Sequence, residues 1–454
     1  MNNKESNRRD FIKTASMCGL GAGVLGTGGL THYGIDAESF AKPPQNAKIR
    51  ITDIKVAIIG NSPVVRIKTD AGIDGLGQGE TTKPYLKSHI EYYNNFLIGE
   101  DPTNVERCLM KIRRAGSFKP WGTSVSIIET ALWDIAGKAA NLPVYKLMGG
   151  KIRDAIRCYN TATSNLVWKA DRAGNTPKDW RDWAVKIKNQ EPGFKIIKVG
   201  GGIHGGWTTT PQTGLYYDTM RSQSRSTVAQ SRRGPLSGYG LNLTVEIVAA
   251  IKEGLGEGID LALDLGPGYM LADAIRLSRA LEPYSPLWLE DMLTGDYYPW
   301  VHADDYAELT RSTTCPIFTG EQIYSRHHFR ELIEKNAIRV IGPDPADVGG
   351  IYEMKWIAEF ADMHGIAIAP HGVFNGLIGL AAQVMLGACM PENFIAFEYP
   401  TPRETWWFDI IEGLPHPIVK NGLVEVWDKP GLGVKFNVTA AKQFLREEDK
   451  DFFD

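Results

Sequence analysis

The stretch that decides the fold is residues 339–372, RVIGPDPADVGGIYEMKWIAEFADMHGIAIAPHG. A short apolar run at 340–341 leads through a Gly-rich turn to an amphipathic helical period and a second buried strand. Parallel strands end at one edge of a sheet, so this βαβ unit places Asp344 beside His371 where α/β barrels carry their chemistry. A carboxylate beside an imidazole orients it and raises its basicity, which makes a candidate general base. Taken alone, the pattern also fits a helix N-cap and a surface histidine.

The composition sets the scale and class of the protein. The 454 residues are 43% hydrophobic and 23% charged, which suits a globular chain with one large domain and a smaller one. The net charge of −3 gives no reason to expect nucleic acid as a partner. Four of the five cysteines lie far apart, without metal-like pairs, and are expected to be buried thiols, although an exported chain could form disulfides.

The N-terminus predicts an export signal. Arg8 and Arg9, followed by a weakly apolar, Gly-rich run, resemble a twin-arginine signal over residues 1–41, with cleavage near Ala41 and a periplasmic destination. The run is too rich in glycine for a membrane span, and Cys18 lacks a lipoprotein context, so no membrane anchor is expected. The alternative is an N-terminal arm with a chance arginine pair.

Residues 49–156 predict an α+β capping domain. A β-meander is expected over 51–79, and helices over 88–96, 105–112 and 124–142. The last of these helices ends before Pro143, as helix-stop rules require.

From residue 157 to 400 the pattern becomes strands alternating with helices, which predicts a closed parallel barrel. The expected strands are 157–161, 196–199, 259–264, 287–290, 317–320, 340–343, 367–370 and 395–398, with helices at 180–189 and 272–281 among the connections. Residues near 200–240 lack an apolar period and are interpreted as a lid over the site; the alternative is an insertion without a role. Residues 401–454, with a strand-like piece at 422–427, are expected to pack back on the capping domain.

Ionisable residues stand at seven successive strand ends: Lys198, Asp264, Glu290, Glu321, Asp344, His371 and Glu398. Three of the acids come from consecutive strands, and such a cluster repels itself unless it holds a cation. Carboxylate oxygens with open positions for water and substrate favour Mg²⁺ over zinc or copper. Helix-capping acids would explain any one of these residues, but they explain the whole set poorly.

The chain resembles the enolase superfamily, in its mandelate racemase and muconate lactonizing branch, over roughly residues 49–430. The residues that carry the resemblance are ETALWDIAGK at 129–138, PVY at 143–145, LMGG at 147–150, and GPD at 342–344 with its following Gly-Gly turn. The resemblance implies a capping domain over a (β/α)7β barrel and a Mg²⁺ ion that stabilises an enediolate. It also implies the site roles: metal ligands Asp264, Glu290 and Glu321, the dyad Asp344 and His371, the eighth-strand acid Glu398, and the first lysine of a Lys-x-Lys motif, Lys198.

Two departures from the family pattern narrow the expected reaction. Gly200 stands where the second lysine of that motif would be, which argues against a racemase with bases on both faces of the α-carbon. Leu265 follows Asp264 where some sugar-acid dehydratases carry a histidine, so the general acid is unassigned. The lid offers the candidates His204, Arg232 and Tyr239, each of which could equally be a solvated surface residue.

The expected function is removal of the proton α to a carboxylate, followed by dehydration of a sugar acid to a 2-keto-3-deoxy acid. The substrate is then a small-molecule carboxylate, and the resemblance suggests a homo-oligomer. One alternative is a cycloisomerase or one-base epimerase of a sugar-derived acid. Another, from a different class, is an exported sugar-acid-binding protein without turnover.

Overall fold

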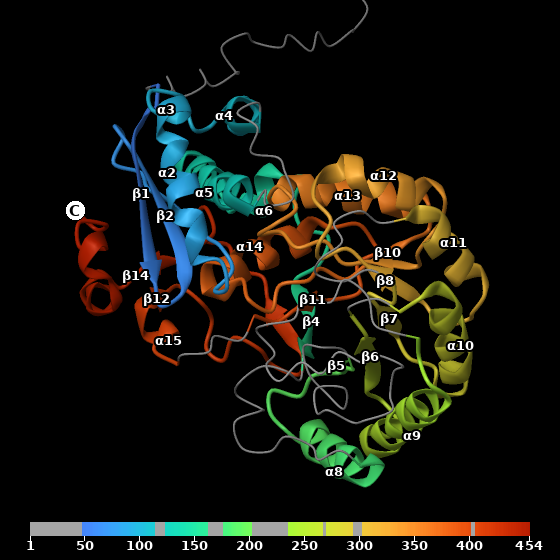
Figure 1. Cartoon of the computed structure of the whole chain (residues 1–454). Coiled ribbons are helices and arrows are strands. Elements are labelled where there is room, and N and C mark those ends of the chain that lie inside the picture. The colour runs from blue at the N-terminus through green and yellow to red at the C-terminus, as the bar shows by residue number, and fades with distance from the viewer. Residues whose placement is uncertain are drawn as a thin grey trace, which may run out of the picture. The chain divides into compact units, whose positions relative to one another are not determined.

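The computed structural model describes residues 48–113, 123–161, 176–201, 235–266, 269–293, 302–400 and 405–454 (Figure 1). It begins with the predicted meander, an antiparallel sheet of β1 (Ile51–Ile59), β2 (Ser62–Thr69) and β3 (Gly75–Gln78). The helices that follow are α2 (Lys87–Tyr92), α3 (Asn94–Leu97), α4 (Val105–Ile112), α5 (Thr123–Ala140) and α6 (Val144–Leu147). Their buried residues form an apolar core between the meander and α5. This strand-rich N-terminal cap is as predicted.

Eight parallel strands form the barrel part of the second, nine-stranded sheet. They are β4 (Ala155–Thr161), β5 (Ile196–Gly200), β6 (Asp260–Asp264), β7 (Trp288–Glu290), β8 (Ile317–Thr319), β9 (Val340–Ile341), β10 (Ala367–Ile368) and β11 (Phe397–Glu398). They pair in chain order from β4 to β10, and β11 pairs with β4. The backbone N–H of Glu398 donates to Pro370 O at 2.9 Å, and that of Ile395 to Ile368 O at 2.9 Å. These bonds join the last edge, so the predicted barrel is confirmed as closed.

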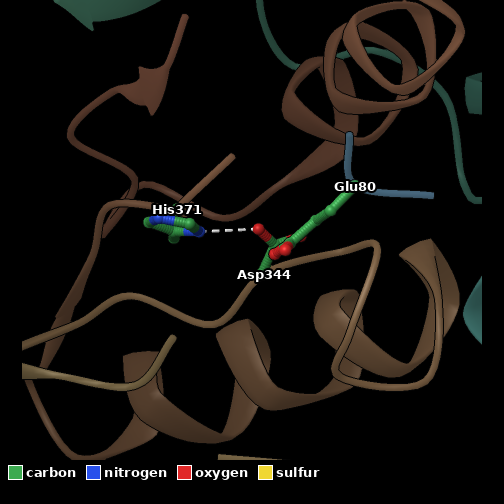
Figure 2. A group of neighbouring side chains, drawn as sticks. All are labelled: Glu80, Asp344 and His371. Atoms are coloured by element: carbon green, nitrogen blue, oxygen red, sulfur yellow. Dashed lines mark hydrogen bonds and ion pairs between the residues drawn. The ribbon is translucent and has the colours of Figure 1, made fainter. Parts of the chain in front are cut away.

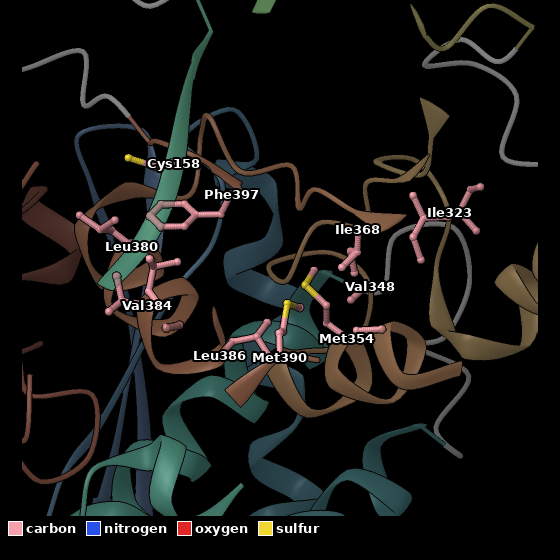
Figure 3. Packing of buried hydrophobic residues seen from close by; sticks show 14 of the residues in the cluster. Cys158, Ile323, Val348, Met354, Ile368, Leu380, Val384, Leu386, Met390 and Phe397 are labelled. Carbon is pink, nitrogen blue, oxygen red and sulfur yellow. The ribbon is translucent and has the colours of Figure 1, made fainter. Parts of the chain in front are cut away.

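Each connection between barrel strands carries a helix on the outside. These helices are α8 (Pro177–Lys188), α9 (Gly238–Leu255), α10 (Leu271–Leu281), α11 (Ala303–Arg311), α12 (Ser325–Glu334), α13 (Ile351–Met363) and α14 (Gly376–Cys389). The fully buried α14 packs Leu380 and Val384 beside Phe397 and Cys158 of the barrel wall (Figure 3). Helix α9 begins at Gly238, two residues before the predicted end of the lid.

The barrel interior is filled by side chains. Tyr159, Trp288 and Phe318 form its centre: the Trp288 and Phe318 rings stack at 5.1 Å between centroids, and Tyr159 meets Trp288 edge-on at 5.3 Å. Smaller residues from the other strands complete this layer. Polar side chains are therefore left to the rim at the strand ends, as expected for this fold.

Two buried acids of α5 connect the cap to the rest of the chain. Glu129 accepts from the backbone N–H groups of Ile351 and Tyr352, both at 2.9 Å, and so satisfies the first turn of α13. Gly350 lies against this carboxylate with φ of 109°, where a Cβ would stand 2.1 Å from Glu129 Oε2. Asp134 accepts from Leu432 N of the C-terminal segment at 2.8 Å, and from Leu76 N within the cap at 3.0 Å. The acids of the motif at 129–138 therefore have structural partners.

The C-terminal segment contacts both parts of the molecule. It contains α15 (Trp407–Ile410), β12 (Ile411–Glu412), β13 (Leu423–Glu425), β14 (Lys435–Phe436) and α16 (Val438–Ala441). The predicted strand-like piece is β13, and it pairs antiparallel with β4 of the barrel. Farther on, Asp449 accepts from Ile58 N of the cap sheet at 2.8 Å.

Some predictions concern residues that the structure does not describe. The export signal, Cys18 and nearly all of the lid lie outside the described ranges. Cys108, Cys158, Cys315 and Cys389 are described, and all four are buried free thiols as predicted. No helix among the described residues is both long and apolar enough to cross a membrane.

Candidate active site

The seven predicted residues stand where the barrel strands end. Lys198, Asp264, Glu290 and Glu398 belong to β5, β6, β7 and β11, while Glu321, Asp344 and His371 follow β8, β9 and β10 within a few residues. Six of them form ion pairs or hydrogen bonds that link one strand end to another. The Oδ1 atom of Asp264 instead accepts a local hydrogen bond from the backbone N–H of Gly266 at 3.1 Å.

Asp344 fixes the orientation of His371. Its Oδ2 lies 2.6 Å from His371 Nδ1 (Figure 2), while its Oδ1 accepts from Ala346 N at 2.7 Å and from Asn375 Nδ2 at 2.8 Å. Burial raises the pKa of the Asp344 carboxyl, and His371 opposes that rise. Since Nδ1 is bonded to a carboxylate, the neutral ring carries its proton there and keeps a lone pair on Nε2.

The Nε2 atom of His371 faces two acids. It lies 3.2 Å from Glu321 Oε2 and 3.4 Å from Glu398 Oε2. Burial lowers the pKa of His371, but Glu321, Glu398 and Asp344 together raise it well above its ordinary value. The imidazole is therefore placed among negative charges that stabilise its protonated form.

Lys198 is buried opposite these acids. Its ammonium lies 2.9 Å from Glu290 Oε1, 3.2 Å from Glu398 Oε1, and 5.6 Å from the centre of the Tyr159 ring. Burial lowers the pKa of Lys198, but Glu290 and Glu398 raise it well above its ordinary value. The side chain is thus a fixed positive charge between two strand ends.

Glu398 is held ionised by its partners. Its Oε2 accepts from Gly372 N at 3.0 Å and from Val373 N at 3.2 Å, and its Oε1 accepts from the Thr161 hydroxyl. Burial raises the pKa of Glu398, but Lys198, His371 and these donors lower it to about 2. The carboxylate can therefore accept hydrogen bonds at any ordinary pH.

The three predicted metal acids share their neighbourhood with a fourth, Asp291. Burial, and then Asp264, Glu321 and Glu398, raise the pKa of Glu290 to about 8 although Lys198 lowers it. Burial, and then the neighbouring acids, also raise the pKa of Asp291 well above its ordinary value. A cluster in which neighbouring carboxylates raise the pKa of Glu290 and Asp291, and in which every ligand atom is an oxygen, suits a hard divalent cation.

A tighter group of potential ligands lies elsewhere. Among the described residues, Glu80, Asp344 and His371 have ligand atoms within 4.8 Å of one another, and Asp264, Glu290 and Glu321 are not grouped so closely. In the tighter group, however, Asp344 already binds His371, and the Lys83 ammonium lies 3.2 Å from Glu80. The expectation that Asp264, Glu290 and Glu321 hold the cation therefore stays a prediction from the sequence.

Sequence reasoning missed several residues around the site. Glu80, Lys83 and Asp347 form ion pairs behind the dyad, Asn375 binds Asp344, and Asp291 faces the acids. The one local signal was the acid Glu80, two residues after the glycine-rich strand β3. Of the proposed general acids, His204 and Arg232 lie outside the described residues. Tyr239 is 56% exposed in the first turn of α9.

The fold and these strand ends define an α/β-barrel enzyme with a capping domain. A model described as the mandelate racemase/muconate lactonizing enzyme N-terminal domain matches residues 61–149, and one described as enolase C-terminal domain-like matches residues 183–441. The chain belongs to the enolase superfamily, in its mandelate racemase and muconate lactonizing branch.

Its relatives specify the class of reaction. The D-xylonate dehydratase of Haloferax volcanii is 32% identical over 415 residues, which cover 88% of this chain and 90% of that protein. A D-galactonate dehydratase family member of Musicola paradisiaca is 29% identical over 420 residues, covering 88% and 94%. The solved structure of a mandelate racemase/muconate lactonizing enzyme-like protein from Rubrobacter xylanophilus has a TM-score of 0.74 and 31% identity, covering 88% and 99%. Together with the family, these dehydratases show that the chain is a lyase of the hydro-lyase class.

Proposed function

We propose that this enzyme dehydrates a sugar acid to a 2-keto-3-deoxy acid with Mg²⁺ as its cofactor. The observation that carries the proposal is the Asp344–His371 dyad with Nε2 directed at the acids of the rim. Gly200, at the end of β5, offers no second base there. The dehydratases of D-xylonate and D-galactonate among the relatives support a polyhydroxylated carboxylate as substrate.

In the proposed reaction His371 Nε2 removes the proton α to the substrate carboxylate. The electron pair of that C–H bond forms the carbon–carbon double bond while the β-hydroxyl takes up a proton and departs as water; the group that delivers this proton is unassigned. The resulting enol then tautomerises to the keto acid. Asp344 holds the ring in place and stabilises the imidazolium that forms. The α-proton is barely acidic in water, so the site must supply preorganised charge for the carboxylate as it gains electron density.

Mg²⁺ would be held by Asp264, Glu290 and Glu321. When bound, the ion supplies positive charge to the substrate carboxylate, as a Lewis acid does. Lys198 adds a second positive charge from β5, and Glu398 a hydrogen-bond acceptor from β11. Both side chains are buried and held by several partners, so little reorganisation is needed when the substrate binds.

The test is a screen of acid sugars with added Mg²⁺, in which the keto acid is trapped with semicarbazide. We expect keto-acid formation, and we expect His371→Ala to abolish exchange of the α-proton in heavy water while metal binding persists. Exchange retained in His371→Ala would overturn the assignment of the base. Turnover without keto acid would instead favour a cycloisomerase or epimerase, and tight binding without exchange would favour a binding protein.

We further propose that residues 1–41 direct export by the twin-arginine route. The support is the Arg8–Arg9 pair and the Gly-rich run that follows it. Because this route transports folded proteins, the enzyme would take up its metal before it reaches the periplasm.

A further inference from the structure

A second group of charged side chains lies behind the dyad and joins the cap to the barrel. Glu80 and Lys83 follow β3 of the cap, and Asp347 lies between β9 and α13. Lys83 Nζ is 2.7 Å from Asp347 Oδ2 and 3.2 Å from Glu80 Oε2. The side chain of Asp347 is 1% exposed and that of Lys83 is 14% exposed. The cap therefore supplies a lysine ammonium group, that of Lys83, to Asp347 in the turn that carries Asp344.

Residues 80–83 of the cap lie against the two turns that carry the dyad, the turn after β9 with Asp344 and the turn after β10 with His371. The backbone N–H groups of Asp347 and Val348 donate to Asp344 O at 3.0 and 2.7 Å, so the position of Asp347 is tied to that of Asp344. Thr81 N donates to Phe374 O at 3.1 Å, three residues after His371. Glu80 points toward Asp344 on the side away from His371 (Figure 2). Residues 80–83 thus hold the two turns from one side.

The charges of Glu80, Lys83 and Asp347 balance when Glu80 carries a proton, because one ammonium group then faces one carboxylate. Its carboxyl hydrogen-bonds that of Asp347, and a bond between two carboxyls requires a proton. Burial, and then Asp347, raise the pKa of Glu80 to about 8, although Lys83 lowers it. Asp347 is then paired with Lys83, and Asp344 with His371.

We propose that Glu80 and Lys83 are positioning residues for the Asp344–His371 dyad, and that the cap thereby controls the base of the barrel. The inference rests on the proposed function, since it concerns the base of that reaction. Neither side chain needs to touch the substrate: they act by holding the turn after β9 and the acceptor for His371 Nδ1. If residues 80–83 moved away from the turn after β9, Asp344 could rotate away from His371 Nδ1. The imidazole ring would then lose its orientation, and Nε2 would no longer point at the substrate.

The experiment compares Lys83→Met and Glu80→Leu with Glu80→Gln and with Lys87→Met in the full-length enzyme. Lys87 follows in the same part of the cap and also pairs with a buried aspartate, Asp449, but far along the chain from the dyad. It is therefore a matched control for loss of an ion pair. Asp347→Asn, which keeps the shape of its side chain, is the second variant if Lys83→Met does not fold.

Three readouts separate positioning from a purely structural role. The first is the rate of α-proton exchange in heavy water, which we expect to fall about 100-fold in Lys83→Met and Glu80→Leu, as displaced catalytic groups do. The second is the isotope effect with α-deuterated substrate, which should rise because proton removal becomes slower. The third is the downfield proton resonance of the His371 Nδ1–H···Asp344 bond, which should shift or disappear. Glu80→Gln, which can still donate to Asp347, should keep exchange within about threefold.

Two results would overturn the proposal. One is an unchanged resonance and exchange rate in folded Lys83→Met and Glu80→Leu. The other is a rise in KM alone with kcat retained, which would mean that Lys83 contacts the substrate. An absence of exchange in the wild-type enzyme with every acid sugar would contradict the proposed function instead, and the resonance would still decide the positioning role.

Discussion

Replacing Asp344 by asparagine should move the ring proton of neutral His371 from Nδ1 to Nε2. The Oδ1 atom of Asp344 faces two N–H donors, Ala346 N at 2.7 Å and Asn375 Nδ2 at 2.8 Å. The amide oxygen of an introduced asparagine must occupy that position, because its NH2 group cannot face two donors. The NH2 group is then directed at His371 Nδ1, which becomes an acceptor. The remaining ring proton moves to Nε2, and the base loses its lone pair.

The expected loss of rate in Asp344→Asn follows from the change of tautomer at His371. In a serine-protease triad the same aspartate-to-asparagine change preserves geometry and costs about 10⁴-fold in kcat. The equivalent here is about 5 kcal/mol of transition-state stabilisation. We expect Asp344→Asn to slow α-proton exchange by about that factor. Exchange is measured by NMR in heavy water, and turnover by semicarbazide trapping.

The fold should be retained in Asp344→Asn, since both donors to the first oxygen keep their acceptor. Asp273→Asn is the control: this buried aspartate accepts from Leu236 N at 2.8 Å in another part of the barrel. We expect normal exchange in Asp273→Asn. If Asp344→Asn exchanged the α-proton within tenfold of the wild-type rate, the tautomer argument would be refuted.

Three further predictions concern packing, capping and export. In Gly342→Ala the new Cβ would stand 1.9 Å from the Phe318 ring, so we expect about 1–3 kcal/mol lower unfolding free energy in urea. In Glu129→Gln one backbone N–H donor at the start of α13 would face the amide NH2 instead of an acceptor. We expect the free energy of unfolding in urea to fall by about 1–3 kcal/mol. An unchanged free energy would contradict that hydrogen-bond pattern. Replacing Arg8 and Arg9 by lysine should retain the protein in the cytoplasm, as cell fractionation would show, and unchanged export would exclude the twin-arginine route.

Much of the fold could be predicted because it is encoded locally. The strand expected at 287–290 is Trp288–Glu290, and the helix expected at 105–112 is Val105–Ile112. Apolar periodicity and turn residues act over a few positions, so one sequence displays them. The start of α9 was missed because Gly238 and Gly240 resemble a loop, whereas Ser237 caps the helix through its bond from Gly240 N at 2.9 Å.

The partners within the site could not be predicted in the same way. Lys198 and Glu290 are 92 residues apart, and Lys83 and Asp347 are 264 apart. Each could be recognised in the sequence as a charged residue, and Lys198 and Glu290 also as residues at strand ends. No local pattern, however, states which acid a buried lysine meets. Which acid the lysine meets depends on how the strand order and the cap bring distant segments of the chain together.

The sequence by itself determined the two-part architecture, the parallel strands and the residues at their ends, Asp344 and His371 above all. The tertiary structure alone decided that Asp344 is bonded on both oxygens, that Lys198 lies between Glu290 and Glu398, and that the cap reaches the dyad through Glu80 and Lys83. The physical reason is that periodicity is a property of neighbours along the chain. Burial and the distance between charges, which set the chemistry, are properties of packing.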